Sequence, residues 1–390
     1  MARRHHLAAD CRADDVLEIV RDLVALHSTD PATVFLSVLA RSDAADVAAV
    51  ERALYDDRTV LRMLGMRRTM WVVPVELAAV VHGACTRTIA VRERQRLVGY
   101  LAEAGVTDEG DAWLTEVEEA TMEALVARGE PTATAELSKD VAGLRERLHL
   151  GVGTRWEAVQ GASGRVLLVM GASGRVVRGR PRGSWISSQY RWAPIASWLP
   201  GGMDRGLTLL PAGVAQVELV WKWLASFGPG TVADLAWWTG LTMAEVRRAV
   251  AELPTVEVDL GGPGAAAGLV LADDLEPVEA PPPSVTLLPA LDPTVMGWKE
   301  RSWYLGGHGP ALFDRSGNAG PTVWWDGRIV GGWAHRRSGE VVFRLLEDVG
   351  TGVTALVEAE AARLQSAIGA VRITPRFRTP LERELSDPDR

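Results

Sequence analysis

The segment AWLTEVEEATMEALVAR, residues 112–128, has apolar residues at helical spacing and predicts an amphipathic helix. The residues GEP at 129–131 follow it and are typical of a helix end. A threonine at position 132 or 134 is placed to cap a second, shorter helix, TAELSKDVAG, over 134–143. The stretch therefore predicts two helices joined by a tight turn.

A basic segment follows these two helices. The sequence GASGRV occurs at 161–166 and again at 171–176, with the apolar residues LLVM between the copies. Gly-Ser turns beside β-branched residues predict a β-hairpin with arginines along its strands and at its tip. Helix, turn, helix and basic hairpin is the order of a winged helix, although a solvated surface hairpin would show the same pattern. Residues 161–192 contain no Asp or Glu, and their arginines are Arg165, Arg175, Arg178, Arg180, Arg182 and Arg191.

The same order of elements is predicted upstream of this segment. Short amphipathic helices are expected over 46–54 and 59–64. The sequence MRRTMWVVP at 66–74 then predicts a strand that carries Arg67 and Arg68. This is a second candidate winged helix.

A third candidate lies downstream. A helix over 215–226 ends at Gly-Pro-Gly, and Thr231 and Thr242 are placed to cap two further helices. The strands TVEVDL and LVLADD follow, joined by GGPGAAAG at 261–268. This wing carries no basic residue, so only the first two units are suited to phosphates.

A Pro-rich break at 276–285 precedes strands that alternate with Gly turns and predict a small antiparallel sheet or barrel, closed by a helix over 354–368. The expected fold class is α+β, with three tandem winged-helix motifs followed by a small C-terminal antiparallel β-barrel. The expected domains are an N-terminal winged helix (1–105), a middle winged helix with a basic wing (106–200), a third winged helix (201–275), and the barrel with its terminal helix (284–390).

Composition excludes several classes of protein. The 390-residue chain has a net charge of −8, which argues against indiscriminate coating of nucleic acid, and its two cysteines suit a reducing cytoplasm. No signal peptide, membrane span, nucleotide-binding loop, zinc motif or nucleophile elbow is found, so we expect no cofactor and no metal. A monomer is expected because no heptad is evident. His5 and His6 lie in an N-terminus that we expect to be frayed.

Three C-terminal motifs carry a resemblance to a known family. They are LPALDPTVMGWKERSWYLG (288–306), LFDRSGNAGPTVWWDGRIVGGW (312–333) and ITPRFRTPLERE (373–384). The chain resembles the bacterial winged helix DNA-binding domain-containing proteins, which include the AlkZ-like and YcaQ-like DNA glycosylases that remove alkylated or crosslinked purines. The resemblance runs from about Asp14 to the C-terminus. It implies tandem winged helices around a DNA channel and a C-terminal barrel.

The resemblance also draws attention to LHSTDP at 26–31. The family's active glycosylases have a Gln, a small or apolar residue and a second Gln before Asp-Pro, and some relatives have His first. Here His27 and Thr29 occupy the two Gln positions, and Thr29 departs from the pattern. The resemblance implies that His27, Thr29 and Asp30 hold the catalytic water. The simpler alternative is that Thr29 or Asp30 caps the next helix, with Pro31 as its first residue.

Arginines match phosphate oxygens because the guanidinium group is a planar fork of donors. We therefore expect DNA contacts from a set of basic residues: Arg67, Arg68, Lys139, Arg178, Arg180 and Arg182. Two functions remain open. The first is a monofunctional glycosylase acting on N-alkylated or bulky-adduct purines in double-stranded DNA, located in the cytoplasm with the nucleoid. The second is a non-catalytic DNA-binding protein, a lesion binder or regulator, on the same scaffold.

Overall fold

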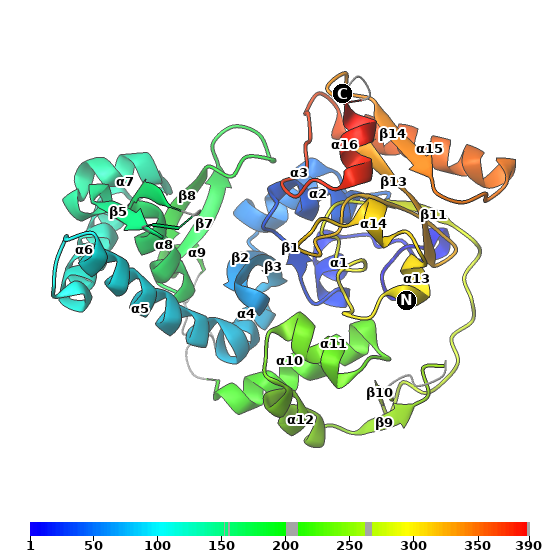
Figure 1. The fold of residues 1–390 in the computed structure, drawn as a ribbon, viewed down its shortest axis with the longest axis horizontal. Helices are drawn as coiled ribbons and strands as arrows, with labels where there is room; N and C mark the ends of the chain where they lie inside the picture. Colours follow the sequence, from blue (N-terminus) through cyan, green and yellow to red (C-terminus); the bar gives the residue numbers. More distant parts are fainter. Residues whose placement is uncertain (152, 155–156, 200–209, 262–266, 388–390) are drawn as a thin grey trace.

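The computed structural model describes residues 1–151, 153–154, 157–199, 210–261 and 267–387. Four parts of mixed helix and strand follow one another along the chain (Figure 1). No helix in these ranges is both long and apolar enough to cross a membrane.

The first part combines three helices with a three-stranded antiparallel sheet. Its elements are α1 (Val16–Asp22), β1 (Leu26–His27), α2 (Pro31–Leu39), α3 (Val47–Glu51), β2 (Val60–Gly65) and β3 (Thr69–Pro74). Both β1 and β2 pair with β3, so the last strand of the part is central. The helix expected over 59–64 is wrong, because this apolar run forms β2. Its side chains are buried on both faces, and such a run has no alternation to separate strand from helix.

The long helix α5 (Arg87–Glu103) leads into the second part, which projects to one side (Figure 1). This part contains α6 (Gly110–Arg128), β4 (Thr132–Ala133), α7 (Thr134–Asp140), β5 (Arg147–Leu150), β6 (Ala158–Gly161), α8 (Ser163–Ala172), β7 (Val176–Pro181) and β8 (Tyr190–Pro194). The sheet order β4-β8-β7 again places the last strand in the centre. The part has a hydrophobic core of its own, to which α5 contributes Leu97 and Leu101.

The hairpin predicted from the repeated GASGRV is wrong in its first strand. Residues 163–172 form the helix α8, because Val166, Leu167 and Met170 fall on one helical face and are buried in the core of this part. The two Gly-Ser copies therefore mark the ends of a helix. The basic hairpin lies further along the chain and consists of β7 and β8.

The third part repeats the arrangement with α10 (Ala212–Phe227), α11 (Val232–Thr239), α12 (Met243–Ala251), β9 (Thr255–Val258) and β10 (Gly268–Leu271). Gly230 bridges to Leu269, so β10 lies between Gly230 and β9. Thr231 and Thr242 cap α11 and α12 as predicted. The predicted boundary at 200/201 and most of the turn at 261–268 lie outside the described residues.

The C-terminal part is built on a four-stranded antiparallel sheet with the order β11-β12-β13-β14. Its elements are β11 (Val285–Leu288), α13 (Ser302–Leu305), α14 (Gly309–Leu312), β12 (Thr322–Trp325), β13 (Arg328–His335), β14 (Val341–Leu345), α15 (Thr351–Ile368) and α16 (Pro380–Ser386). The sheet is open, since β11 and β14 do not pair in the part of the chain that is described. The antiparallel sheet is thus present, and its closure into a barrel is not observed.

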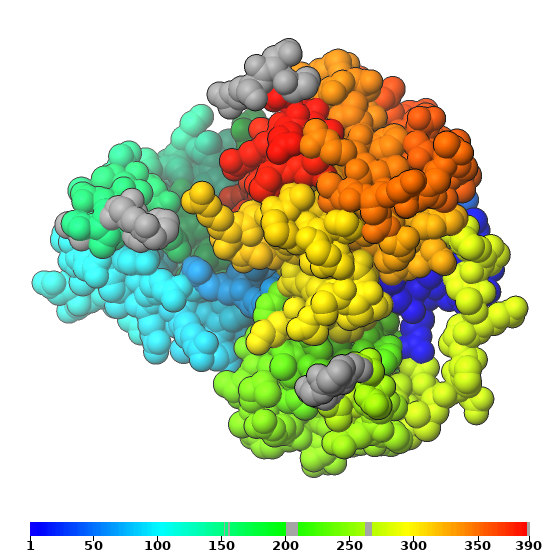
Figure 2. All heavy atoms as spheres, turned by 45° about the vertical axis from the view of Figure 1, so that its right-hand side comes forward, coloured from blue at the N-terminus to red at the C-terminus, as the bar shows by residue number. Residues whose placement is uncertain are grey.

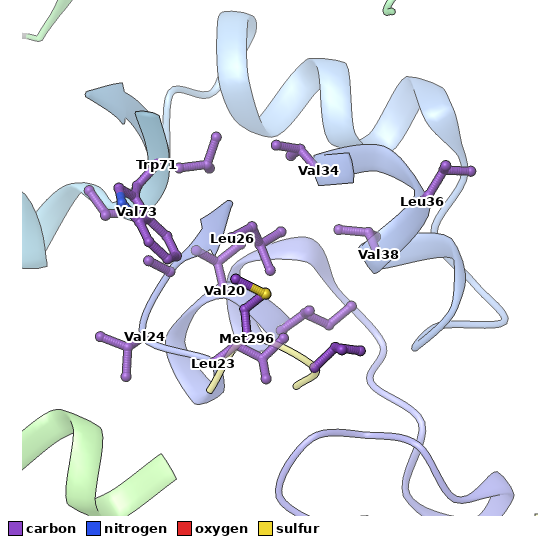
Figure 3. Packing of buried hydrophobic residues seen from close by; sticks show 14 of the residues in the cluster. Val20, Leu23, Val24, Leu26, Val34, Leu36, Val38, Trp71, Val73 and Met296 are labelled. Atoms are coloured by element: carbon purple, nitrogen blue, oxygen red, sulfur yellow. The ribbon is translucent and has the colours of Figure 1, made fainter. Parts of the chain in front are cut away.

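One hydrophobic core joins the first, third and C-terminal parts, and the second part adds residues such as Trp185, Ile195 and Trp198 to it. Figure 3 shows Met296 from the C-terminal part among Val20, Leu23, Leu26 and other side chains of the first part. In the space-filling view, the C-terminal part (yellow to red) hides most of the blue first part on this face (Figure 2). These three parts therefore pack as one body.

An ion pair between Arg41 and Asp292 lies inside this body, and both side chains are 0% exposed. The Arg41 guanidinium donates to both carboxylate oxygens at 2.6 and 2.8 Å, and it also donates to the carbonyl oxygens of His5 and Ser37. Thr294 accepts a further bond from Arg41 and contacts Nδ1 of His5. The expectation of a frayed terminus is therefore wrong, because this network fixes His5 in the core.

Removing one partner of the Arg41–Asp292 pair should destabilise the fold strongly. In Asp292→Asn an uncompensated guanidinium stays buried, and the free energy of unfolding should fall by about 3–5 kcal/mol. Urea denaturation of the full chain measures this. The control is Glu76→Gln, which breaks the exposed ion pair to Arg21 and should cost less than about 1 kcal/mol. Equal losses in the two variants would contradict the assignment.

Candidate functional site

His27 is the last residue of the short strand β1, which pairs with β3 opposite Trp71. Its side chain is 3% exposed, and its ring lies 4.7 Å from the Trp71 ring. Burial, with a smaller contribution from the nearby Arg67 charge, lowers the His27 pKa to about 3. The imidazole is therefore neutral near pH 7. Its Nδ1 accepts a long hydrogen bond of 3.4 Å from the Thr29 backbone N–H, and no described residue hydrogen-bonds to Nε2.

Asp30 caps α2, as the simpler reading of LHSTDP predicted. One carboxylate oxygen accepts from the Ala32 backbone N–H at 3.1 Å, and the other accepts from the Arg376 backbone N–H at 2.8 Å. Burial raises the Asp30 pKa, and these two N–H groups oppose that shift. Both oxygens face backbone donors, and no described contact joins the Asp30 carboxylate to the His27 ring.

A cleft opens beside this loop between the first and second parts. Its empty space, including the portion open to solvent, is about 1680 Å³. Ser28, Thr29 and Pro31 line one wall, whereas His27 lies behind them. Residues from the start of α7 and from the hairpin β7–β8 line the opposite wall, including Tyr190 and Trp192.

The cleft is positively charged, although the whole chain is acidic. The charged side chains that line it are Arg68, Arg178, Arg182 and Arg376, and none of its described lining residues is Asp or Glu. The pKa of Arg178 is lowered to about 10, mainly by burial and to a smaller extent by the charges of nearby Arg62 and Arg376. Coulomb repulsion among these guanidinium groups is relieved when an anion enters. The cleft therefore suits a polyanion.

The predicted DNA-binding residues separate into two groups. Arg68, Arg178 and Arg182 line the cleft, where Arg68 also pairs with Glu93 at 2.6 Å and Arg182 with Glu136 at 3.1 Å. Arg178 has no ion pair among the described residues and lies over the rings of Tyr190 and Trp192.

The other predicted residues lie outside the cleft lining. Arg67 lies in the turn between β2 and β3 with φ of 53°, and its guanidinium stacks on Trp237 of the third part at 4.1 Å. Arg180 pairs with Glu51 at 2.7 Å and Asp56 at 3.0 Å, joining the second part to the first. Lys139 is exposed near the end of α7.

Sequence reasoning missed three residues of the site. Arg376 lines the cleft, and its guanidinium donates to the Thr29 carbonyl oxygen at 3.4 Å. Arg62 contacts Ser28, and Tyr190 contacts Arg62. The basic character of ITPRFRTPLERE was a signal for Arg376, whereas Arg62 and Tyr190 stand in unremarkable strand sequences.

A model of the AlkZ-like family, described as DNA glycosylase AlkZ-like, matches residues 20–367. The chain belongs to the AlkZ-like DNA glycosylase family. Its fold is similar to that of the solved Streptomyces sahachiroi DNA glycosylase AlkZ, with a TM-score of 0.69 over 96% of this chain and 97% of that chain, at 20% sequence identity. Comparison with curated protein sequences gave no significant match.

One group of side chains could hold a metal ion within the described ranges. Ligand atoms of His6, Glu18 and Asp22 lie within 4.8 Å of one another. His6 already bonds to Asp22 at 2.7 Å, and none of the three residues lines the cleft. We therefore give this group no role in the site.

As a member of a DNA glycosylase family, the chain should bind duplex DNA with cleft arginines and not with Arg180. Arg178→Gln should weaken binding and flatten the salt dependence by about 0.9 in log Kd per log salt if one phosphate contact is lost. Arg180→Gln is the matched control on the same strand, and it should leave the slope unchanged. Fluorescence anisotropy over a salt series measures both. If Arg180→Gln flattened the slope and Arg178→Gln did not, the cleft would not be the DNA-binding surface.

Proposed function

We propose that the first three parts of the chain are winged helices. The support is a shared topology, in which helix, strand or bridge, two helices and two strands follow in order and the last strand lies in the centre of each sheet. The second part has the hairpin β5–β6 inserted between its two helices. We keep the boundaries expected from the sequence, 1–105, 106–200, 201–275 and 284–390, as the proposed limits of these units and of the C-terminal part. DNA would lie in the cleft between the first two.

We propose that the protein hydrolyses the N-glycosidic bond of an N-alkylated or bulky-adduct purine in double-stranded DNA. The observation that carries this proposal is the basic cleft, whose described lining has no carboxylate. The HST loop, His27-Ser28-Thr29 of the family motif, lines this cleft through Ser28 and Thr29. Phosphates on either side of the target nucleotide would contact Arg68, Arg178, Arg182 and Arg376. An enzyme acting on one base must also take it out of the stack, and the cleft gives it space.

The proposed reaction requires little acid catalysis. Alkylation places positive charge on the purine, so the base leaves with the electrons of the broken C1′–N bond and becomes neutral. The sugar passes through an oxocarbenium-like state, and a water adds its oxygen to C1′ and loses a proton to solvent. The protein's contribution is then to extrude the nucleotide and to position the water.

In this proposal His27 positions the water as a hydrogen-bond donor. The pKa of about 3 keeps the imidazole neutral and makes it a poor base. Because Nδ1 accepts from the Thr29 N–H, Nε2 carries the ring proton and can donate it to the water oxygen, as a Gln side-chain N–H does. Thr29, whose hydroxyl accepts only a long bond of 3.4 Å from the Met70 N–H, is the second contact. Asp30 is a positioning residue, because it fixes the loop through its cap.

Base release from duplex DNA carrying N7-alkylguanine tests the proposal. His27→Ala should slow single-turnover excision by about 100-fold or more, as expected for loss of a group that acts on the water. His27→Gln, which restores a hydrogen-bond donor, should recover much of the rate. Thermal melting verifies that each variant is folded. Binding of the duplex without excision by the wild type, across a panel of alkylated purines, would instead favour the non-catalytic DNA-binding function.

The depressed His27 pKa also predicts the pH profile. A group with a pKa of about 3 stays neutral from pH 5 to pH 8, so the single-turnover rate should not change with its titration. The measurement is excision against pH, corrected for spontaneous depurination in the absence of protein. A rate that falls with a midpoint near 6.5 as the pH decreases would show that His27 acts as an ordinary general base.

A further inference from the structure

Arg62, on β2, joins the HST loop to the opposite wall of the cleft. Its Nη1 donates to the Ser28 hydroxyl at 2.5 Å and to the Tyr190 hydroxyl at 2.6 Å. Its guanidinium also lies over the Tyr190 ring at 4.8 Å. Ser28 belongs to the first part and Tyr190 to the basic hairpin of the second part, and both line the cleft. One nitrogen atom therefore links the two walls.

The charge of Arg62 is poorly compensated at this position. Its side chain is 3% exposed, and it forms no ion pair with any described residue. Its Nε and Nη2 are buried and have no hydrogen-bond partner. A buried cation without a counterion is costly, and a link between two hydroxyl groups does not need a full charge. Burying Arg62 here therefore lowers the stability of the fold, as strained residues at functional sites often do.

Direct binding of DNA phosphate does not account for Arg62. Its two unpaired nitrogens are inaccessible, and Arg62 lines a small inner pocket together with apolar residues of β2 and α8 instead of the cleft. Arg178 is the charged residue that lines both spaces, together with Leu64, Met70, Leu168 and Trp192. The two arginines thus have different positions: Arg178 lines the cleft and can contact DNA, whereas Arg62 lies behind the cleft wall.

We propose that Arg62 is a positioning residue. It holds the HST loop in the geometry that positions the water only while Tyr190 of the basic hairpin contacts Arg62. This inference rests on the proposed glycosylase function. Arg62 holds the Ser28 side chain, and the Ser28 N–H bonds to the Met70 carbonyl oxygen at 2.8 Å, so the middle of the loop is held from both sides. The water contacts of His27 and Thr29 flank this fixed residue. Hydrolysis therefore depends on the simultaneous contact of Arg62 with Ser28 on one wall of the cleft and with Tyr190 on the other.

The first test uses excision rates and duplex affinity together. Arg62→Met should slow single-turnover excision by about 100-fold, the effect of a misplaced reacting group, while affinity for the duplex stays unchanged. Tyr190→Phe, which removes one hydroxyl and no charge, should slow excision in the same direction. Adding Ser28→Ala to Arg62→Met should have no further effect. Full excision in Arg62→Met, or equal losses of affinity and rate, would overturn the proposal.

Arg58→Met is the matched control. Arg58 also links the first and second parts, since its Nη1 donates to the Trp198 carbonyl oxygen at 2.7 Å and its guanidinium lies over the Trp198 ring at 4.3 Å. It does not contact the HST loop, so Arg58→Met should keep the wild-type excision rate. A loss equal to that of Arg62→Met would show that any weakening of this interface has the same effect.

Hydrogen exchange gives a readout that does not depend on activity. Exchange at the Ser28 and Thr29 amides should accelerate in Arg62→Met and Tyr190→Phe and stay at the wild-type rate in Arg58→Met. Unchanged exchange in both former variants would overturn the proposed link. If wild type released no base, the glycosylase proposal would fail, whereas the exchange data would still decide whether Arg62 fixes the loop.

Discussion

The Arg41–Asp292 ion pair is the constraint on which the site depends. Arg41 follows α2, and Asp292 lies in the LDPT turn of the C-terminal part, so their contact holds α2 against that part. The pair is tolerated at 0% exposure because carbonyl and hydroxyl oxygens satisfy the remaining guanidinium donors. The HST loop enters the other end of the same helix. Fixing α2 therefore also fixes the point at which Asp30 meets the Arg376 backbone.

An acidic chain acquires a basic cleft through the placement of its carboxylates. Outside the cleft lining, arginines such as Arg180 are paired with acids, and these pairs hold the second part to the first. Inside it, Arg178 and Arg376 have no ion pair among the described residues. Arg68 and Arg182 also line the cleft but pair with Glu93 and Glu136, so Arg178 and Arg376 are the cleft arginines left for an anion. The net charge of −8 gives no information about this local arrangement.

Local sequence signals predicted some local features. Thr231 and Thr242 cap their helices as predicted, and each forms a capping box with the carboxylate three residues later. The cap predicted at Thr132 or Thr134 is wrong, because Ala133 is the residue before α7. The same kind of reasoning misassigned residues 163–172, since Gly-Ser pairs at both ends suit a hairpin as well as a helix, and tertiary packing decided for the helix. The HST loop stands out in the sequence as polar residues before an apolar helix, and the family resemblance strengthened its assignment to the site. Arg62 and Tyr190 were not predicted as site residues, because they are 128 residues apart in the sequence and no local pattern indicates their contact.

The burial of His27 narrows the chemistry that this loop can perform. Desolvation keeps the ring neutral, and a neutral ring with so low a pKa cannot retain the proton of an attacking water. In the proposed reaction His27 therefore acts neither as a general base nor as an imidazolium acid near pH 7. An N-alkylated purine already carries the positive charge that an acid would otherwise supply, whereas an unmodified purine does not. With His27 in the proposed role, discrimination between damaged and normal bases would arise in part from this lack of acid and base catalysis, with no contact to the alkyl group required.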